Sequence, residues 1–332
     1  MMKKILVIGS NSFSGSHFVN YLLKKKYKVF GFSRSTQLKK EFLPYGNSNN
    51  LKNFFFNQCN LNKSKDIIKV LHIIKKNKIK NIVNFASQGM VEESFFNPVD
   101  WYKTNLLSTV NLIEKIKNEN IDNYLHVSTP EVYGNITGTI DENSSKKPST
   151  PYAISRLAMD YHLEAIMNID NFPVKFSRAA NVYGEGQQLY RIIPKTILKI
   201  LKKEKIILHG LGASKRSFVH IKDITEGYFK ILNNGRVGNS YHLSSNNFIS
   251  IKDLVIMICK KLDVNYKKHV VEQKSDRLGK DFIYKLSSKK IYKELGWEAT
   301  TTLDHGLDRS IEWVKKNFSN FKNKELEYIH KK

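Results

Sequence analysis

The chain has 332 residues, with 55 Lys and Arg against 30 Asp and Glu, a formal net charge of +25, and two cysteines. This length suits one large domain or two closely joined ones, and Cys59 and Cys259 are too few for a disulfide framework or a cysteine-based zinc site. No run of about 18 apolar residues predicts a transmembrane helix. The N-terminal MMKKILVIGS is interpreted as a strand rather than a signal peptide, so we expect a cytoplasmic protein.

The positive charge raises the question of a nucleic-acid or membrane-surface partner. Only eight of the 55 basic residues are arginine, the side chain best suited to forked contacts with phosphates and bases. The lysines occur in twos and threes, as at Lys24–Lys26 and Lys202–Lys203, mostly at helical spacings between apolar residues. We interpret most of the charge as solvated surface and expect no nucleic-acid partner and no membrane partner.

The first half of the chain alternates short apolar runs with helical patterns. Runs that predict buried strands are Lys4–Gly9, Tyr27–Phe32, Asn53–Asn57, Asn81–Ala86, Tyr124–Ser128 and Val174–Ala179. Helical patterns lie between them at Ser16–Lys24, Asp66–Lys76, Pro98–Asn118 and Pro151–Asn168. This alternation predicts an α/β fold with a doubly wound parallel sheet of the Rossmann type.

The pattern becomes less regular after residue 181, with helices expected near Ile251–Lys261, Ser287–Leu295 and Gly306–Asn317. We expect a first domain over residues 1–180, with a returning segment near 217–245. A smaller C-terminal α/β substrate domain is expected over residues 181–216 and 246–320. The highly charged tail Lys322–Lys332 is a candidate for fraying.

A glycine-containing turn, Gly9-Ser-Asn-Ser-Phe-Ser-Gly15, follows the first strand and opens the first helix. Gly9 permits the tight turn and Gly15 permits close helix–strand packing, while Ser12 stands where a middle glycine is expected. The free N–H groups of a helix N-terminus favour a pyrophosphate. We predict a dinucleotide site at this turn, which includes Ser12 and Phe13.

The end of the second strand bears on the type of dinucleotide. An acidic residue there binds the ribose of NAD, whereas an arginine accommodates the 2′-phosphate of NADP. The sequence reads Ser33-Arg34-Ser35, so NADP is favoured and NAD stays open. Asn60 follows the third strand and is expected to meet the adenine edge, and the predicted cofactor site also includes Leu61 and Ala86.

Polar residues follow the fifth strand in Ser128-Thr-Pro-Glu-Val-Tyr-Gly134, at the edge where ligands of doubly wound sheets lie. Tyr152 and Arg156 are four residues apart in the next helical pattern and therefore share one helix face. A cation near a tyrosine favours the phenolate, which makes Tyr152 a candidate base. The ten histidines show no metal-ligand spacing, so no metal site is expected.

Together these motifs resemble the extended short-chain dehydrogenase/reductases that act on nucleotide sugars, an NAD(P)-dependent epimerase/dehydratase family. The resemblance is strongest to the 4,6-dehydratases. It covers nearly the whole chain and rests on Gly9–Gly15, Asn84–Gln88, Thr104–Asn105, Ser128–Gly134, Pro151–Arg156, Arg178–Gly184, Arg216–Asp223 and Asp276–Trp297. Arg178–Gly184 and Asp276–Trp297 are similar to the corresponding segments of dehydratases acting on dTDP-glucose. Asn84–Gln88 and the single carboxylate Glu131 are nearer to those of dehydratases acting on GDP-mannose.

The resemblance implies catalytic roles for four residues. Tyr152 would take the proton of the sugar C4 hydroxyl, Thr129 would hydrogen-bond that hydroxyl, and Arg156 would support the tyrosine and the cofactor. Glu131 would remove the C5 proton and is a candidate to protonate the departing C6 hydroxyl. The cofactor would take a hydride from C4 and return it to C6, giving a 4-keto-6-deoxy sugar nucleotide.

The resemblance also implies a substrate site and a partner. The substrate would be a nucleotide-diphosphate sugar, and the residues expected to bind it are Gln88, Asn181, Arg191, Arg216 and Arg277. A homodimer through a four-helix bundle, formed by Pro98–Asn118 and Pro151–Asn168, is expected by analogy.

Two departures from the family pattern keep alternatives open. The family motif has lysine where this chain has Arg156, and Pro130 stands where the dTDP-glucose enzymes carry an aspartate that acts as a general acid. Proline cannot donate a proton, so elimination would depend on Glu131 or a water. The alternatives are a 4-epimerase or 4-oxidising enzyme of the same fold, and a non-catalytic protein that binds a dinucleotide or a nucleotide sugar.

Overall fold

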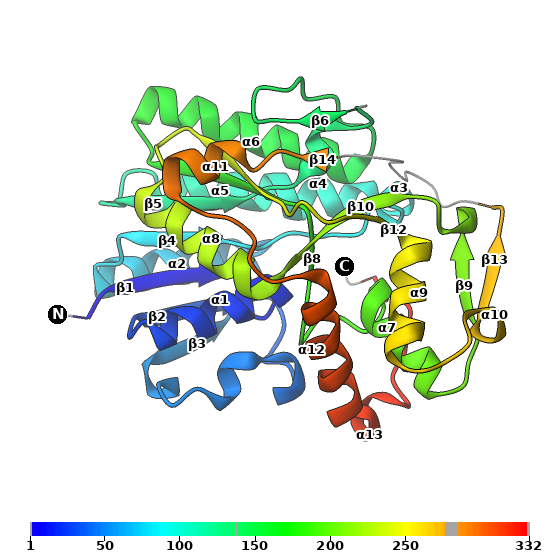
Figure 1. Cartoon of the computed structure of the whole chain (residues 1–332). Helices are drawn as coiled ribbons and strands as arrows, with labels where there is room; N and C mark the ends of the chain where they lie inside the picture. Colours follow the sequence, from blue (N-terminus) through cyan, green and yellow to red (C-terminus); the bar gives the residue numbers. More distant parts are fainter. Residues whose placement is uncertain (1, 137, 276–284, 331–332) are drawn as a thin grey trace.

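A seven-stranded parallel sheet forms the centre of the protein, as the computed structural model of residues 2–136, 138–275 and 285–330 describes it (Figure 1). Its strands, in spatial order, are β11 (Ser240–Leu243), β7 (Val174–Ala179), β5 (Asn123–Val127), β4 (Asn81–Asn84), β1 (Lys4–Ile8), β2 (Lys28–Ser33) and β3 (Phe54–Gln58). The strand order reverses direction around β1 and β4. This topology confirms the predicted doubly wound fold.

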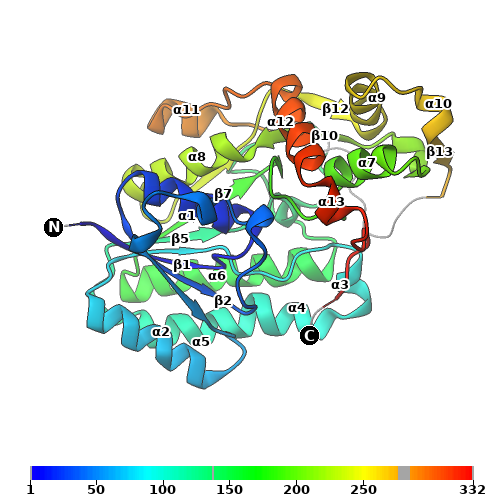
Figure 2. The same ribbon diagram turned by 90° about the horizontal axis from the view of Figure 1, so that it is seen from below.

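Helices cover both faces of this sheet because successive strand residues point to opposite sides. On β1, Ile5 and Val7 pack under α1 (Phe13–Lys24) and α8 (Ile221–Asn234), whereas Leu6 and Ile8 pack under the opposite layer. That layer consists of α2 (Ser64–Asn77), α5 (Ser108–Ile116) and α6 (Pro151–Asp170). The two layers appear above and below the sheet in Figure 2.

A second group of elements lies beyond the carboxyl ends of the strands. It contains a small sheet of β8 (Asn181–Tyr183), β10 (Lys215–His220) and β12 (Phe248–Ser250), and the pair β9 (Ile206–His209) and β13 (Val270–Gln273). Its helices are α7 (Ile192–Leu201), α9 (Ile251–Lys261), α10 (Tyr266–His269), α12 (Leu303–Lys316) and α13 (Phe318–Phe321). These elements share an apolar core of their own. The remaining elements are α3 (Glu93–Phe96), α11 (Lys289–Leu295) and the pair β6 (Thr139–Ile140) with β14 (Lys285–Leu286).

The segment expected as one helix over Pro98–Asn118 differs from the prediction. It consists of α4 (Pro98–Tyr102), a π-helical turn η4 (Lys103–Leu107) and α5. The wider turn carries Asn105, which is fully buried and bonds to the backbone of Gln88 in both directions, at 2.6 and 3.1 Å. A π-turn thus places a polar side chain against the loop after β4, as such turns often do near functional sites.

The C-terminal tail also differs from the expectation of fraying. His330 stacks on Trp101 and bonds to the carboxylate of Asp100 at 2.7 Å, and Tyr328 bonds to the side chain of Gln88 at 3.1 Å. Figure 2 shows this end of the chain beside α3 and α4. Within the described residues, no helix has both the length and the apolar character needed to cross a membrane.

Candidate functional site

The turn after β1 has the close backbone geometry that a dinucleotide requires. Gly9 has φ +81°, and a Cβ added at Gly15 would lie 2.1 Å from the carbonyl oxygen of Gly9. Ser12 caps α1, because its hydroxyl accepts a hydrogen bond from the Gly15 N–H at 3.0 Å. The serine in the middle position therefore organises the helix N-terminus that faces the site.

A pocket of about 240 Å³ adjoins this turn. Its lining includes eight of the residues predicted for ligand binding: Gly9, Ser12, Ser33, Arg34, Asn60, Leu61, Ala86 and Gln88. Phe13 and Gly15 lie next to it in the first turn of α1. Four strand ends, those of β1 to β4, thus contribute to one cavity, whose position and glycine-lined backbone fit an adenine dinucleotide.

Three catalytic candidates come together after β5. Thr129 caps the 3₁₀ turn η5 (Pro130–Tyr133), where its hydroxyl accepts from the Glu131 N–H at 3.4 Å. The Thr129 side chain also hydrogen-bonds to Tyr152 of α6, whose own N–H donates to the Ser94 hydroxyl at 3.2 Å. Pro130 occupies the first position of η5, where a missing N–H costs nothing.

Opposing groups set the pKa of Tyr152. This pKa lies above its usual value, because removal from water and the neighbouring Glu131 carboxylate outweigh the Arg156 guanidinium, the Thr129 hydrogen bond and Arg191, which lower it. A phenol in this setting works as a base only if the positive charge of Arg156 stays close to it. The position of that guanidinium is therefore important for the chemistry.

Arg156 is almost completely buried, with 1% of its surface exposed. Its Nη2 donates to Nε2 of His126 at 3.1 Å and to the backbone carbonyl of Val127. Its Nε and Nη1 have no hydrogen-bond partner in the parts of the chain that the structure describes. Buried N–H groups of this kind fit an oxygen-rich ligand such as a ribose, because an unpaired buried donor is costly.

The predicted substrate-binding residues occupy several positions. Gln88 lies in the dinucleotide pocket, where its side chain accepts from Arg34 at 3.3 Å. Arg191 precedes α7 and lies near Gly89 and Tyr152. Asn181 and Arg216 lie on the paired strands β8 and β10, and Arg277 lies outside the described residues.

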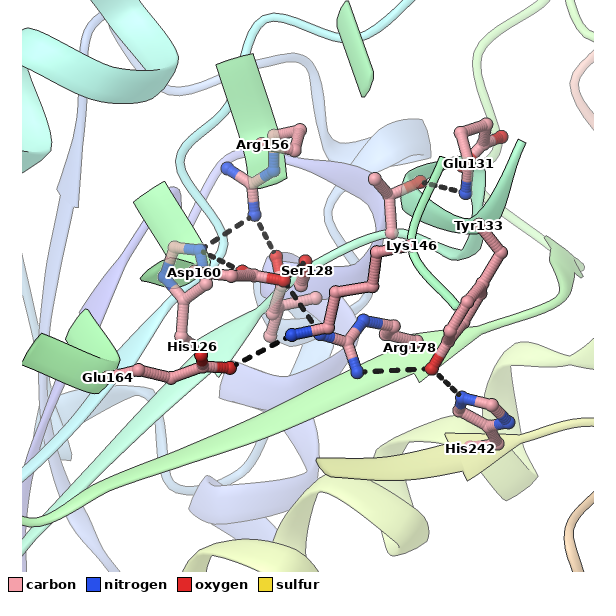
Figure 3. Close-up of polar contacts among 12 residues, drawn as sticks. His126, Ser128, Glu131, Tyr133, Lys146, Arg156, Asp160, Glu164, Arg178 and His242 are labelled. Atoms are coloured by element: carbon pink, nitrogen blue, oxygen red, sulfur yellow. Dashed lines mark hydrogen bonds and ion pairs between the residues drawn. The ribbon is translucent and has the colours of Figure 1, made fainter. Parts of the chain in front are cut away.

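The structure adds a buried polar cluster that the sequence did not predict as part of the site (Figure 3). Asp160, one turn beyond Arg156 on α6, bonds to Nη2 of Arg178 and to the Ser128 hydroxyl, both at 2.8 Å. Arg178 also donates to the Tyr133 hydroxyl at 3.3 Å, and that hydroxyl lies 2.7 Å from Nε2 of His242. A sequence signal was available for Asp160, since its spacing from Arg156 places both on one helix face.

Comparison with known proteins identifies the family of this chain. Residues 6–310 match the family model of GDP-mannose 4,6 dehydratase. The mouse dTDP-D-glucose 4,6-dehydratase is 29% identical, over 97% of this chain and 92% of the mouse protein.

Solved structures agree with this match. The dTDP-glucose 4,6-dehydratase of Streptomyces venezuelae, with NAD and TYD bound, has a TM-score of 0.88 at 27% identity and covers 95% of this chain and 98% of its own. The Bacillus anthracis dTDP-glucose 4,6-dehydratase in complex with NAD has a TM-score of 0.83 at 30% identity, covering 96% and 98%. These relatives are nucleotide-sugar 4,6-dehydratases, which are enzymes, and with the family match over most of its length this chain belongs to the GDP-mannose 4,6-dehydratase family.

Proposed function

We propose that this protein is a nucleotide-sugar 4,6-dehydratase that converts a nucleotide-diphosphate sugar to its 4-keto-6-deoxy form. The observation that carries the proposal is the convergence of Thr129, Glu131 and Tyr152 beside the buried Arg156. The names of the relatives support the same reaction class. A nicotinamide dinucleotide in the pocket after β1 would supply an acceptor and later a donor of hydride.

The residues of this chain then have separate tasks. Tyr152 accepts the proton of the C4 hydroxyl, and Thr129, hydrogen-bonded to Tyr152, aligns that hydroxyl. Once C4 is a ketone, the C5–H bond is acidic, and Glu131 removes that proton. Arg156 holds the cofactor ribose through its remaining N–H groups and keeps positive charge near Tyr152.

Elimination of the C6 hydroxyl requires a proton donor. Pro130 has no acidic group, so Glu131, protonated by the C5 proton that it has just removed, returns this proton to the departing hydroxyl. One carboxyl group acting in both directions expels the water without a second acid, and after hydride returns to C6 a proton from solvent completes C5 while the proton held by Tyr152 is released to solvent. The substrate is held by Gln88, Asn181, Arg191, Arg216 and Arg277, and the arginines suit its diphosphate.

We propose NADP as the preferred dinucleotide. The end of β2 offers Ser33 and Arg34 instead of a carboxylate, and both line the pocket. The relatives whose structures are named above hold NAD, so this preference is specific to this chain. Arg34→Gln is expected to weaken NADP⁺ binding at least tenfold and to change NAD⁺ binding little, as measured by calorimetry. A wild-type protein that binds NAD⁺ more tightly would contradict the preference.

A homodimer is proposed through the surface of α4, η4 and α6. Val99 and Leu107 are 72% and 56% exposed, and Ile154 and Tyr161, two turns apart on α6, are 42% and 50% exposed. Apolar side chains gathered on adjacent helices favour burial against a second copy. Light scattering should show a dimer for the wild type and a monomer for the double variant Leu107→Glu/Tyr161→Glu. The control Val237→Glu should stay dimeric. A wild-type monomer would contradict this proposal.

A reducing compartment such as the cytoplasm is also proposed, because Cys59 and Cys259 are free thiols buried at different places in the fold.

Mass spectrometry of products tests the proposed reaction. The protein, with NAD⁺ or NADP⁺, is incubated with GDP-mannose, dTDP-glucose, UDP-glucose and CDP-glucose. We expect one of these to yield a product lighter by one water, and Tyr152→Phe to abolish its formation while retaining dinucleotide binding. A product of unchanged mass would instead identify a 4-epimerase, and accumulation of reduced cofactor would identify a 4-oxidising enzyme.

A further inference from the structure

The buried cluster beside Arg156 contains more positive than negative charge. Asp160 and Arg178 are fully buried, and Asp160 is the carboxylate that faces the two guanidinium groups of Arg156 and Arg178. The proposed reaction uses Arg156 and leaves the roles of Asp160 and its neighbour His126 unexplained. Figure 3 shows the His126 ring beside both the Arg156 guanidinium and the Asp160 carboxylate, with one ring nitrogen facing the two groups.

The two oxygens of Asp160 differ in their contacts. Oδ2 accepts from Arg178 and from Ser128, both at 2.8 Å. Oδ1 has no hydrogen-bond partner among the described residues, and Nε2 of His126 lies 3.6 Å away from it. A buried carboxylate oxygen without a donor attracts any cation that can reach it.

His126 contacts both Arg156 and Asp160 through one atom, its Nε2. Burial, together with the positive charge of Arg156, lowers the pKa of His126 to about 3, so the ring is neutral. Its Nε2 therefore accepts the hydrogen bond from Nη2 of Arg156 at 3.1 Å, which assigns the ring hydrogen to Nδ1. The same ring nitrogen therefore anchors the guanidinium by a hydrogen bond and lies beside Oδ1 of Asp160.

Without this hydrogen bond, Nη2 of Arg156 would turn to Oδ1 of Asp160 and form a direct ion pair. Such a pair is short and strong in a buried setting, and it would draw the guanidinium toward Asp160 and neutralise its charge. Tyr152 would then face Glu131, which disfavours the phenolate, with the Thr129 hydroxyl and the exposed Arg191 as the groups left to favour it.

We propose that His126 is a positioning residue that holds the Arg156 guanidinium at the end of β5 and keeps it out of an ion pair with Asp160. The charge of Arg156 thereby remains available to Tyr152 and to the cofactor ribose. The role of Tyr152 as a base rests on the proposed function. The contacts of His126 with Arg156 and Asp160 do not depend on that function.

Substitutions at His126 test the anchor directly. His126→Phe and His126→Leu both remove the hydrogen-bond acceptor of Arg156. Because the two side chains differ in shape, one variant can still be tested if the other does not fold. His126→Asn keeps an acceptor and is the conservative variant. His242→Phe is the matched control, since His242 is equally buried, has a pKa of about 3 and belongs to the same cluster, but is bonded to Tyr133.

Two measurements on these variants follow the position of Arg156 and the titration of Tyr152. In crystal structures of His126→Phe or His126→Leu, Arg156 should lie within hydrogen-bonding distance of Oδ1 of Asp160. In the NAD(P)⁺-bound protein, the tyrosinate absorbance of Tyr152, isolated by subtraction of Tyr152→Phe, should titrate about one pH unit higher than in the wild type. His126→Asn and His242→Phe should titrate like the wild type.

A second substitution gives the reverse effect. Adding Asp160→Asn to His126→Phe removes the attracting charge and should return the titration of Tyr152 toward the wild-type value. An unmoved guanidinium in both apolar variants, or an equal shift in His242→Phe, would overturn the proposal. Because neither measurement needs turnover, its failure is distinguishable from failure of the proposed reaction, which is judged by product mass.

Discussion

Gly15 shows how the site depends on single residues. Its position allows the backbone of α1 to approach the turn after β1 so closely that no Cβ fits beside the carbonyl oxygen of Gly9. Ser12 replaces a glycine in this turn and contributes a helix cap. The turn therefore tolerates a side chain at its middle position and excludes one at its end.

Gly15→Ala is expected to destabilise the protein by about 2 kcal/mol and to weaken dinucleotide binding at least tenfold, because backbone atoms must move to admit the methyl group. Urea unfolding and calorimetric titration with NAD(P)⁺ measure the two effects. Gly46→Ala is the control, since the nearest atom to its added Cβ is a side-chain carbon 3.8 Å away. Unchanged binding by Gly15→Ala would contradict this account of the turn.

For single residues, the sequence predicted contacts between side chains of one helix. It missed contacts between side chains of different elements. Tyr152 and Arg156 were identified because they share a helix face. His126 was interpreted as part of a buried strand, and its contact with Arg156 exists only because α6 packs across β5. The Asp160–Arg178 pair joins α6 to β7 and has no local signature.

At the scale of elements, apolar runs and helical periods predicted six of the seven strands of the central sheet, β1 to β5 and β7, because buried parallel strands are nearly continuous apolar runs. The π-turn at Lys103–Leu107 was missed, since its cause is the burial of Asn105 against a distant loop. The two-residue strands β6 and β14 are too short to show a period. Their pairing is fixed by tertiary structure.

Asp223 provides a link between elements that can be tested. Its buried carboxylate, on α8, accepts hydrogen bonds from the Thr300 hydroxyl at 3.1 Å and from the N–H and hydroxyl of Thr301 at 2.9 and 3.0 Å. Asp223→Ala should lower the free energy of unfolding by about 2–4 kcal/mol, because the donors of the segment before α12 lose a charged acceptor.

Urea denaturation at pH 7 measures this loss. Asp304→Ala is the control, since that carboxylate is 69% exposed, pairs with Lys261 at the surface and should cost less than about 1 kcal/mol. Equal losses for the two variants would show that Asp223 does not connect α8 to α12 in the manner described.

For the whole molecule, the formal net charge of +25 comes mainly from lysines, since only eight of the 55 basic residues are arginine. Some lysines form surface ion pairs, such as Lys80 with Asp122 and Lys252 with Glu272. The buried arginines Arg156 and Arg178 instead face a carboxylate and the candidate active site. The proposed reaction therefore uses a buried arginine, Arg156, and does not depend on the excess of surface lysines.

Buried histidines predict acid sensitivity of the whole fold. Burial lowers the pKa of His126 and His242 to about 3, below the value of about 6.5 in the unfolded chain. Between these values the unfolded state binds more protons, so stability falls as the pH falls below 6.5, by about 2 kcal/mol for each histidine at pH 5. Melting temperature should drop between pH 7 and pH 5. The exposed-site variant His72→Gln should show the same drop, and a flat profile would contradict the prediction.

The central claim is that Glu131 and Tyr152 carry out elimination without an acid at position 130. Product formation in deuterated water tests it most directly, with the nucleotide sugar that is turned over. We predict a product lighter by one water with one deuterium at C5, and loss of this product in Glu131→Gln, which retains substrate binding. A dehydrated product that still forms in Glu131→Gln, or a product with neither water loss nor deuterium at C5, would contradict the account.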